Sequence, residues 1–293
     1  MAVSSIQATK KPPWLKVKLP THENYFFVSR LLKKHDLHTI CQSAKCPNVS
    51  ECWAHKTATF LILGDTCTRA CAFCAVMKGL PSPPSSDEPE RVSQAIEDLG
   101  LHYVVITSVT RDDLPDGGAS QFAATLKTIK SKNSSIRAEV LIPDFNGDER
   151  ALHTVIVAGP DVLNHNIEVP EAIYPLINRP LSNYRRSLKI LERAKTMGAT
   201  TKSGLMIGLG EDKRDIFQTF SDLKSVSCDL LTIGQYLQPS RSNPPTQRYY
   251  TPEEFEELKD NALKYGFSEV ESGPLVRSSY GAHRMYKKLK RTC

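Results

Sequence analysis

The chain has 293 residues, of which 40% are hydrophobic and 24% are charged, and its formal net charge is +6. These proportions are ordinary for a globular protein, and the longest apolar stretches have the length of a strand, too short to span a membrane. The modest positive charge comes without a recognisable nucleic-acid-binding module, so we expect no nucleic-acid partner.

The N-terminal residues 1–19 are polar and contain no apolar signal core, which predicts a cytoplasmic protein. Six of the eight cysteines lie between residues 41 and 74. In a long chain without a signal segment, such clustering favours reduced metal ligands over disulfides. We interpret Cys228 as a small buried hydrophobic residue.

After the cysteine-rich region, short apolar runs alternate with amphipathic stretches, as in a chain of strand–helix units. Glycines follow several helical stretches, where a helix commonly ends. The predicted strands are 60–64, 103–108, 137–142, 162–168, 203–207 and 230–236. The predicted helices between them are 90–99, 118–132, 148–157, 184–197 and 215–226, and a further helix begins at the capping box that starts with Thr251.

This strict alternation predicts an α/β fold with a parallel sheet. Six units are fewer than a complete eight-unit barrel, so we expect a partial (β/α)6 TIM-like barrel with N-terminal and C-terminal extensions. The expected division is an N-terminal extension 1–58, a barrel 59–238 and a C-terminal extension 239–293. The carboxyl ends of the strands should form the reactive end.

Three cysteines, Cys67, Cys71 and Cys74, form a C-x3-C-x2-C pattern directly after the first predicted strand; we call them the loop triple. Three thiolates on one loop suit an iron–sulfur cluster, and with four irons one iron would keep an open position. A zinc site would usually show four ligands. A ferredoxin-like electron carrier would usually be a small domain.

A second set, Cys41, Cys46 and Cys52, lies upstream with C-x4-C-x5-C spacing; we call it the upstream triple. By themselves these residues could form a zinc knuckle. Together with the loop triple they suggest two clusters, and so chemistry beyond electron storage.

The loop triple, with Phe73 just before its last cysteine, resembles the radical S-adenosylmethionine superfamily. The resemblance implies that the open iron binds the amino and carboxylate groups of S-adenosylmethionine. An electron from the cluster then yields a 5′-deoxyadenosyl radical. Removing hydrogen from an unactivated C–H bond needs such a cofactor, because side chains cannot do it.

Further motifs follow one another along the chain: Lys-Val-Lys-Leu-Pro at 16–20, Cys-Pro-Asn-x-x-Glu-Cys-Trp at 46–53, Thr-Ser-Val-x-Arg-Asp-Asp-Leu-x-Asp-Gly-Gly-Ala at 107–119, Pro-Asp-Phe-x-Gly at 143–147 and Arg-Ser-Ser-Tyr at 277–280. Together they resemble the lipoyl synthase family over residues 13–282. Hypotheses that remain beside it are a biotin synthase-type sulfur inserter and a non-catalytic two-cluster electron carrier or scaffold.

The resemblance implies that the loop triple holds the radical-generating 4Fe-4S cluster and the upstream triple an auxiliary 4Fe-4S cluster. Ser279 is then the fourth auxiliary ligand; without the motif, a serine capping a turn is the simpler interpretation. The implied reaction inserts sulfur from the auxiliary cluster at C6 and C8 of a protein-bound octanoyl-lysine.

Candidate contacts to S-adenosylmethionine lie at the expected reactive end. Asn166 and Glu168 could bind ribose hydroxyls or only solvate a strand end. A glycine-rich strand end allows close approach to adenine, although Gly208 could equally belong to a turn. The full candidate set is Phe73, Asn166, Glu168, Gly208, Gln235 and Leu237.

The resemblance also implies partners: octanoylated lipoyl carrier domains of a 2-oxoacid dehydrogenase E2 or a glycine cleavage H protein, an electron donor such as ferredoxin or flavodoxin, and an iron–sulfur carrier protein. We expect a monomer with no membrane contact. Two departures from the family pattern, Lys56 and the loop 240–245, bear on carrier docking. Arg111, Asp112 and Asp113 are interpreted as a structural ion network or as substrate contacts.

Overall fold

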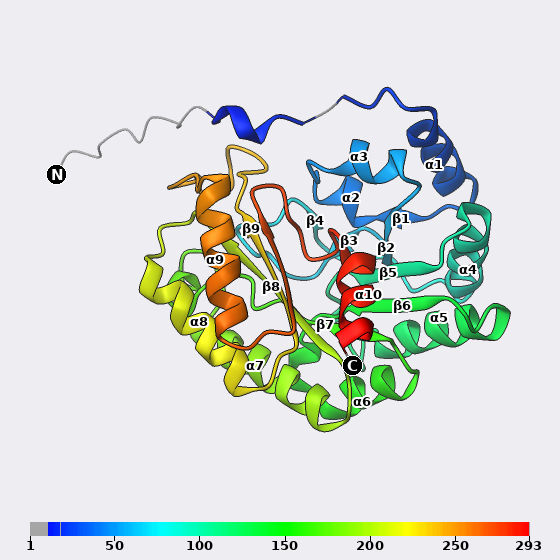
Figure 1. The fold of residues 1–293 in the computed structure, drawn as a ribbon. Helices are drawn as coiled ribbons and strands as arrows, with labels where there is room; N and C mark the ends of the chain where they lie inside the picture. The colour runs from blue at the N-terminus through cyan, green and yellow to red at the C-terminus, as the bar shows by residue number, and fades with distance from the viewer. Residues whose placement is uncertain (1–10, 18, 293) are drawn as a thin grey trace.

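The computed structural model describes residues 11–17 and 19–292. Within them the main sheet has the strand order β1-β2-β5-β6-β7-β8-β9-β10, curved as a partial barrel (Figure 1). All neighbouring strands are parallel except β1, which pairs antiparallel with β2. The strands are β1 His38–Thr39, β2 Thr59–Ile62, β5 Tyr103–Ser108, β6 Arg137–Leu141, β7 Val162–Asn164, β8 Thr201–Ile207, β9 Leu230–Gln235 and β10 Glu269–Gly273, with β3 Thr66–Cys67 and β4 Met77–Lys78 in a separate small sheet.

The predicted α/β partial barrel is confirmed, and its six expected strands are β2 and β5 to β9. The sequence prediction omitted β10, which lies in the C-terminal extension and adds a further parallel strand beside β9. The run 269–273 contains two glutamates, a serine and a glycine, so it lacks the continuous apolar pattern of a buried parallel strand.

Most of the helices connect successive strands and lie outside the sheet (Figure 1). Two of them begin with capping boxes: Asp212 and Asp215 start α8, and Thr251 and Glu254 start α9. The helices are α1 Glu23–Lys34, α2 Ile40–Ser43, α3 Val49–Ala54, α4 Glu88–Leu99, α5 Ala119–Lys132, α6 Glu149–Val157, α7 Leu181–Thr196, α8 Lys213–Ser225, α9 Pro252–Lys264 and α10 Ala282–Thr292, with short 3-10 turns at Pro13–Leu15, Phe145–Gly147 and Glu171–Ile173.

The strand predicted at 162–168 ends early, at Asn164. The hydroxyl of Ser203 accepts the backbone N–H of Ile167, and Glu168 has a positive φ of 70°. These local contacts replace regular ladder pairing, because a side-chain acceptor and a left-handed residue both interrupt an extended strand. Only an isolated bridge between Glu168 and Leu205 continues along β8.

The inner face of the barrel holds a buried ion pair. Lys202 Nζ lies 2.9 Å from Glu139 Oε1, and both side chains are almost fully buried. The carboxylate of Glu139 also accepts from Tyr103 Oη and Asn164 Nδ2, each at 2.8 Å. These extra hydrogen bonds offset part of the cost of taking two charges out of water.

Helix α10 lies in front of the sheet in Figure 1 and packs against its inner face. Its Met285 and Leu289 pack with Val162 and Leu230 of the inner sheet face. The ring of His283 stacks on Tyr103 with ring centroids 5.4 Å apart. The C-terminal extension therefore contributes both a strand and an internal plug. No described helix is long and apolar enough to cross a membrane.

Candidate active site

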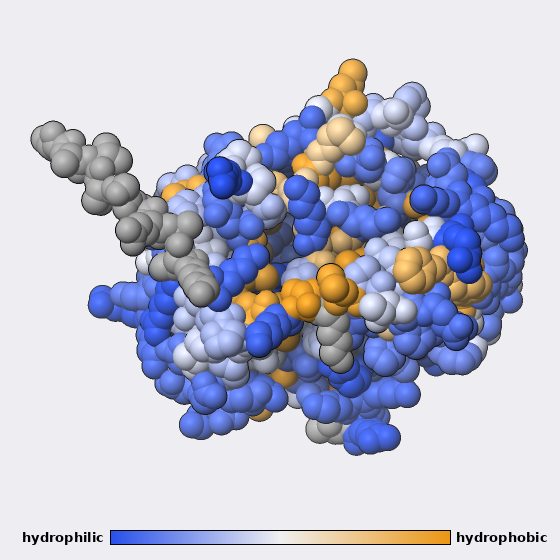
Figure 2. All heavy atoms as spheres, turned by 90° about the horizontal axis from the view of Figure 1, so that it is seen from above, coloured by the Kyte–Doolittle hydropathy of each residue, from blue (hydrophilic) through white to orange (hydrophobic). Residues whose placement is uncertain are grey.

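A cavity of about 590 Å³ lies at the carboxyl ends of the strands. It has Lys11 and Val17 among its lining residues, so the segment 11–17 lies along it, and this segment runs over the top of the molecule in Figure 1. Figure 2, which looks down on that face, shows apolar residues gathered near its middle. Five of the six clustered cysteines and the proposed serine ligand line the cavity: Cys41, Cys46, Cys67, Cys71, Cys74 and Ser279.

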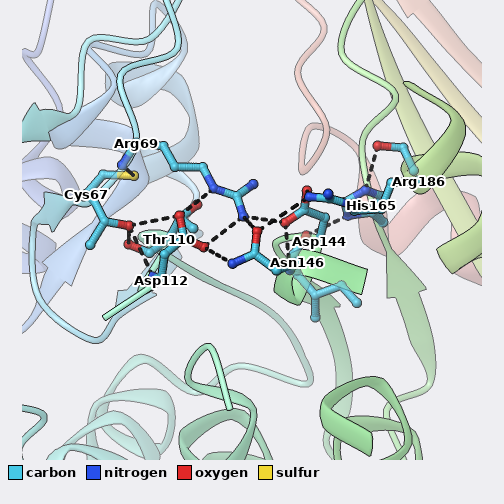
Figure 3. A network of polar contacts seen from close by, with 11 residues as sticks. Cys67, Arg69, Thr110, Asp112, Asp144, Asn146, His165 and Arg186 are labelled. Atoms are coloured by element: carbon cyan, nitrogen blue, oxygen red, sulfur yellow. Dashed lines mark hydrogen bonds and ion pairs between the residues drawn. The ribbon is translucent and has the colours of Figure 1, made fainter. Parts of the chain in front are cut away.

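Arg69 fixes the loop that carries the loop triple (Figure 3). Its guanidinium donates to the two carboxylate oxygens of Asp112, at 2.7 and 2.8 Å, and to Asn146 Oδ1 at 2.8 Å. It also pairs with Asp144 Oδ1 at 2.6 Å, and Arg186 donates to the other oxygen of Asp144 at 3.1 Å. The loop is therefore tied to the segments that follow β5 and β6.

The charges in this network stabilise one another. Although burial alone would raise it, the pKa of the Asp144 carboxyl is held well below its ordinary value by Arg69. Burial opposes the charge of Arg69, but the two carboxylates beside it raise its pKa. The neighbouring His165 is buried, which lowers its pKa to about 4, and its ring nitrogens face Ile142 O and Ser187 Oγ at 2.9 and 3.0 Å.

The upstream triple lies against the C-terminal motif 277–280. Asn48 donates to the backbone oxygen of Leu275 at 2.6 Å, and Tyr280 Oη donates to Glu51 Oε1 at 2.9 Å. Burial raises the pKa of the Cys46 thiol, and the buried guanidinium of Arg277 opposes part of that rise. Segments more than 220 residues apart in sequence are thus in direct contact.

The clustered thiols suit an iron–sulfur cluster in their chemistry and in their placement. All six are free. Burial is the main cause that raises the thiol pKa of Cys41 to about 11, of Cys52 to about 12 and of Cys74 to about 11. Such thiols stay protonated until a cation replaces the proton, and soft iron is a suitable cation.

Among residues 11–17 and 19–292, no three His, Cys, Asp or Glu side chains converge closely enough to hold one metal ion. A four-iron cube takes each thiolate at a separate corner, so its ligands surround a volume instead of a point. Cys52 is partly buried and interacts electrostatically with Cys41 and Cys46, but it is not among the residues that line the cavity.

Five of the six predicted S-adenosylmethionine contacts line the cavity: Phe73, Asn166, Glu168, Gln235 and Leu237. Glu168 is half-buried in the cavity wall, and desolvation raises the pKa of its carboxyl. The Asn166 amide lies 3.5 Å from the Glu168 carboxylate, at the outer limit of a hydrogen bond.

Gln235 and the sixth candidate, Gly208, have structural partners. Gln235 lines the cavity, but its amide donates to backbone oxygens that include Arg248 O at 2.8 Å, and it accepts from Tyr250 N at 2.9 Å. Gly208 does not line the cavity. A Cβ there would collide with the Gln235 amide, so the glycine makes room for this contact.

Sequence reasoning did not single out Arg179. Its side chain is 9% exposed and lines the cavity, and its Nε is buried without a hydrogen-bond partner in the described residues. It acts electrostatically on Glu168 and on the thiol of Cys71. The sequence Asn-Arg-Pro at 178–180 looks like a turn, so only the fold shows that this cation faces the cavity.

Arg111, the first residue of the motif 111–113, has a structural role. Arg111 is 1% exposed, pairs with Asp113 at 2.7 Å and donates to Leu63 O at 3.3 Å. The structural interpretation of an ion network is therefore confirmed for Arg111 and Asp113, while Asp112 belongs to the network around Arg69.

Comparison with known proteins agrees with this geometry. The family model of the Radical SAM superfamily matches residues 61–223, and this superfamily implies a 4Fe-4S cluster and S-adenosylmethionine. The fold resembles SuiB of Streptococcus suis bound to precursor peptide SuiA, with a TM-score of 0.56, 12% identity and coverage of 77% of this chain and 52% of that one. It also resembles methylornithine synthase (PylB), with a TM-score of 0.52, 12% identity and coverage of 85% and 82%.

Sequence relatives are much closer. The chain is 51% identical over 281 residues to the lipoyl synthase of Caldicellulosiruptor saccharolyticus, covering 95% of this chain and 98% of that protein. It is 50% identical over 287 residues to the lipoyl synthase of Pelodictyon phaeoclathratiforme, covering 97% of each. The family predicted from the cysteine motifs is confirmed: the chain belongs to the lipoyl synthase family of radical S-adenosylmethionine enzymes.

Proposed function

We propose that this enzyme inserts two sulfur atoms, at C6 and C8, into an octanoyl chain carried on a lysine of a protein, and so makes the lipoyl cofactor. The observation that carries the proposal is one common cavity, lined by the whole loop triple, by Cys41 and Cys46 of the upstream triple, and by residues 277–279. An electron carrier would need two clusters but no large cavity between them.

In this proposal the loop triple holds the radical-generating cluster, and the upstream triple with Ser279 holds the auxiliary cluster. When bound, the first cluster supplies the electron that cleaves S-adenosylmethionine, and the second supplies sulfide. The protein would position both, with residues 1–58 carrying the upstream ligands, 59–238 the barrel and 239–293 the serine.

Polar residues at the ends of β7 and the following turn would hold S-adenosylmethionine. Asn166 and Glu168 would bond its ribose hydroxyls, and Phe73 and Leu237 would provide apolar surface for adenine, since all four line the cavity. The guanidinium of Arg179 suits a carboxylate, because its buried Nε has no partner in the described chain and ion-assisted hydrogen bonds are strong.

Part of the remaining cavity wall is apolar and suits an alkyl chain. Leu61, Val109, Leu141, Leu205 and Met206 line it. An eight-carbon chain buried there would be stabilised by roughly 0.8 kcal/mol per CH2 group. Octanoylated E2 or H-protein carriers would present this chain from outside, with ferredoxin or flavodoxin as electron donor and an iron–sulfur carrier to restore the auxiliary cluster.

The test is anaerobic turnover of an octanoyl-lysyl peptide with reductant and S-adenosylmethionine, followed by mass measurement of the peptide. The proposal expects a product that has gained two sulfur atoms and formation of 5′-deoxyadenosine. Cleavage of S-adenosylmethionine with an unchanged peptide mass would contradict the proposed substrate. A control with Ser279→Ala should retain cleavage and lose sulfur insertion.

A further inference from the structure

The segment 275–280 connects the two halves of the active cavity. On the side of the upstream triple, Asn48 donates a hydrogen bond to Leu275 O, and Tyr280 Oη donates one to Glu51. On the opposite side of the cavity, Ser278 Oγ donates to Asn166 Oδ1 at 2.8 Å. Asn166 follows β7, on the side of the cavity proposed above for S-adenosylmethionine.

Two glycines on the inner sheet face make room for this segment. A Cβ on Gly204 of β8 would lie 2.6 Å from Asn166 Oδ1 and 2.7 Å from Ser278 Oγ. A Cβ on Gly234 of β9 would collide with the backbone oxygen of Val276. Neither glycine has a positive φ, so close approach of the segment, not backbone conformation, accounts for both.

The segment is also fixed from within. Val276 N donates to Gly273 O at 3.0 Å, and Tyr280 N donates to Arg277 O at 2.8 Å. The buried guanidinium of Arg277 bonds Val276 O at 2.7 Å. The serine hydroxyl of residue 278 thus lies on a turn with little freedom, one residue from the proposed ligand Ser279.

We propose that Ser278 is a positioning residue that couples the S-adenosylmethionine side of the cavity to the auxiliary-cluster side. Its bond to Asn166 sets where Ser279 lies relative to bound S-adenosylmethionine, and the bond between Tyr280 and Glu51 sets where it lies relative to the upstream triple. The segment 275–280 acts as a bridge of fixed length between the two sites. This inference rests on the proposed function for the identity of the two sites.

Such a bridge has a chemical purpose. A carbon radical must meet the sulfur donor before it reacts elsewhere, and a displacement of about 1 Å can cost on the order of a hundredfold in rate. A looser bridge would therefore leave cleavage of S-adenosylmethionine intact, but more S-adenosylmethionine would be consumed for each sulfur atom inserted.

The test uses the reconstituted full-length enzyme and two measurements. Hydrogen exchange of the backbone amides of residues 275–281 reports how firmly the bridge is held, without turnover. The ratio of 5′-deoxyadenosine to lipoyl product reports how often cleavage of S-adenosylmethionine leads to sulfur insertion. Ser278→Ala and Tyr280→Phe each remove one hydrogen bond. We expect exchange about three- to tenfold faster in this segment, from the usual net strength of one bond, and a raised ratio in both variants.

A double substitution adds specificity. If the hydrogen bond between Ser278 and Asn166 holds the bridge, adding Ser278→Ala to Asn166→Ala should not raise the exchange rate of the segment any further. Ser268→Ala is the matched control, an exposed serine of the same extension just before β10, and it should change neither measurement.

Unchanged exchange and an unchanged ratio in Ser278→Ala would overturn the inference. Faster exchange with an unchanged ratio would also overturn it, because the contact would then be structural only. Failure of the wild-type enzyme to add sulfur would instead count against the proposed function, and the exchange comparison would still decide whether Ser278 holds the bridge.

Discussion

Arg69 Nη2 and Asp144 Oδ1 lie 2.6 Å apart and join the cysteine loop to the segment after β6. The carboxylate of Asp144 is fully buried, while the guanidinium retains 17% exposure. A buried, charge-assisted pair of this kind fixes orientation as well as contributing free energy. It therefore gives the loop triple a defined position on the barrel.

Asp144→Asn should loosen this loop. The asparagine keeps one acceptor but loses the charge that faces Arg69 and Arg186, and hydrogen bonds to charged groups are worth about 1.5–3 kcal/mol. We expect a lower unfolding temperature and less iron retained by the loop triple after desalting. Asp260→Asn, on the exposed face of α9, is the control; equal iron retention in both variants would contradict a positioning role.

Lys202→Met should destabilise the protein strongly. It leaves the carboxylate of Glu139 buried with only Tyr103 and Asn164 as partners, and breaking a buried pair typically costs about 3–5 kcal/mol. Urea unfolding should show the loss as a lower midpoint. Adding Glu139→Gln should recover part of it, and no shift in the single variant would mean that the pair is not buried as described.

His165 gives the enzyme a defined sensitivity to acid. Its pKa is lowered from 6.5 to about 4, so between these values the unfolded chain binds a proton that the folded protein excludes. The free energy of unfolding should fall by about 3 kcal/mol as the pH drops through this window.

His165→Gln tests this dependence. Because glutamine does not titrate, the difference in unfolding temperature between the wild type and the variant should shrink steadily from pH 7 to pH 4. A difference that stays constant with pH would show that His165 titrates at its ordinary value.

Arg179→Gln should weaken binding of S-adenosylmethionine about 10- to 100-fold, because the cation proposed to face its carboxylate is removed. Isothermal titration of the reconstituted enzyme measures this directly. Arg185→Gln is the matched control, because Arg185 is 68% exposed and pairs with Glu171 at the surface. Equal affinity in Arg179→Gln and the wild type would assign Arg179 to structure alone.

The barrel could be predicted from sequence because strands β2 and β5 to β9 and helices α4 to α8 alternate with clear periods. Strand β10 was missed because its glutamates, serine and glycine are only partly buried, so the run lacks the continuous apolar pattern of a buried parallel strand. The two cysteine triples could be proposed as cluster ligands from sequence because their spacing is distinctive. Arg179 and Ser278 were not found, because their importance comes from contacts between distant segments.

Gly208 was singled out from sequence, but the structure places a side chain of this protein beside it. Its glycine-rich context indicated close approach of a ligand, and the close approach exists, but its partner is the side chain of Gln235. A sequence shows that space is needed beside a glycine without showing what fills it. Gly204 and Gly234, by contrast, make room for the segment that carries Ser279.

The proposed function depends on two separate clusters that face one cavity. Iron and sulfide counting, after anaerobic reconstitution, should be done on the wild type and on two variants in which either the loop triple or the upstream triple is replaced by alanine. We expect about eight irons and eight sulfides in the wild type and about four of each in either variant. About four irons in the wild type, or zinc in place of iron at the upstream triple, would contradict the proposed function.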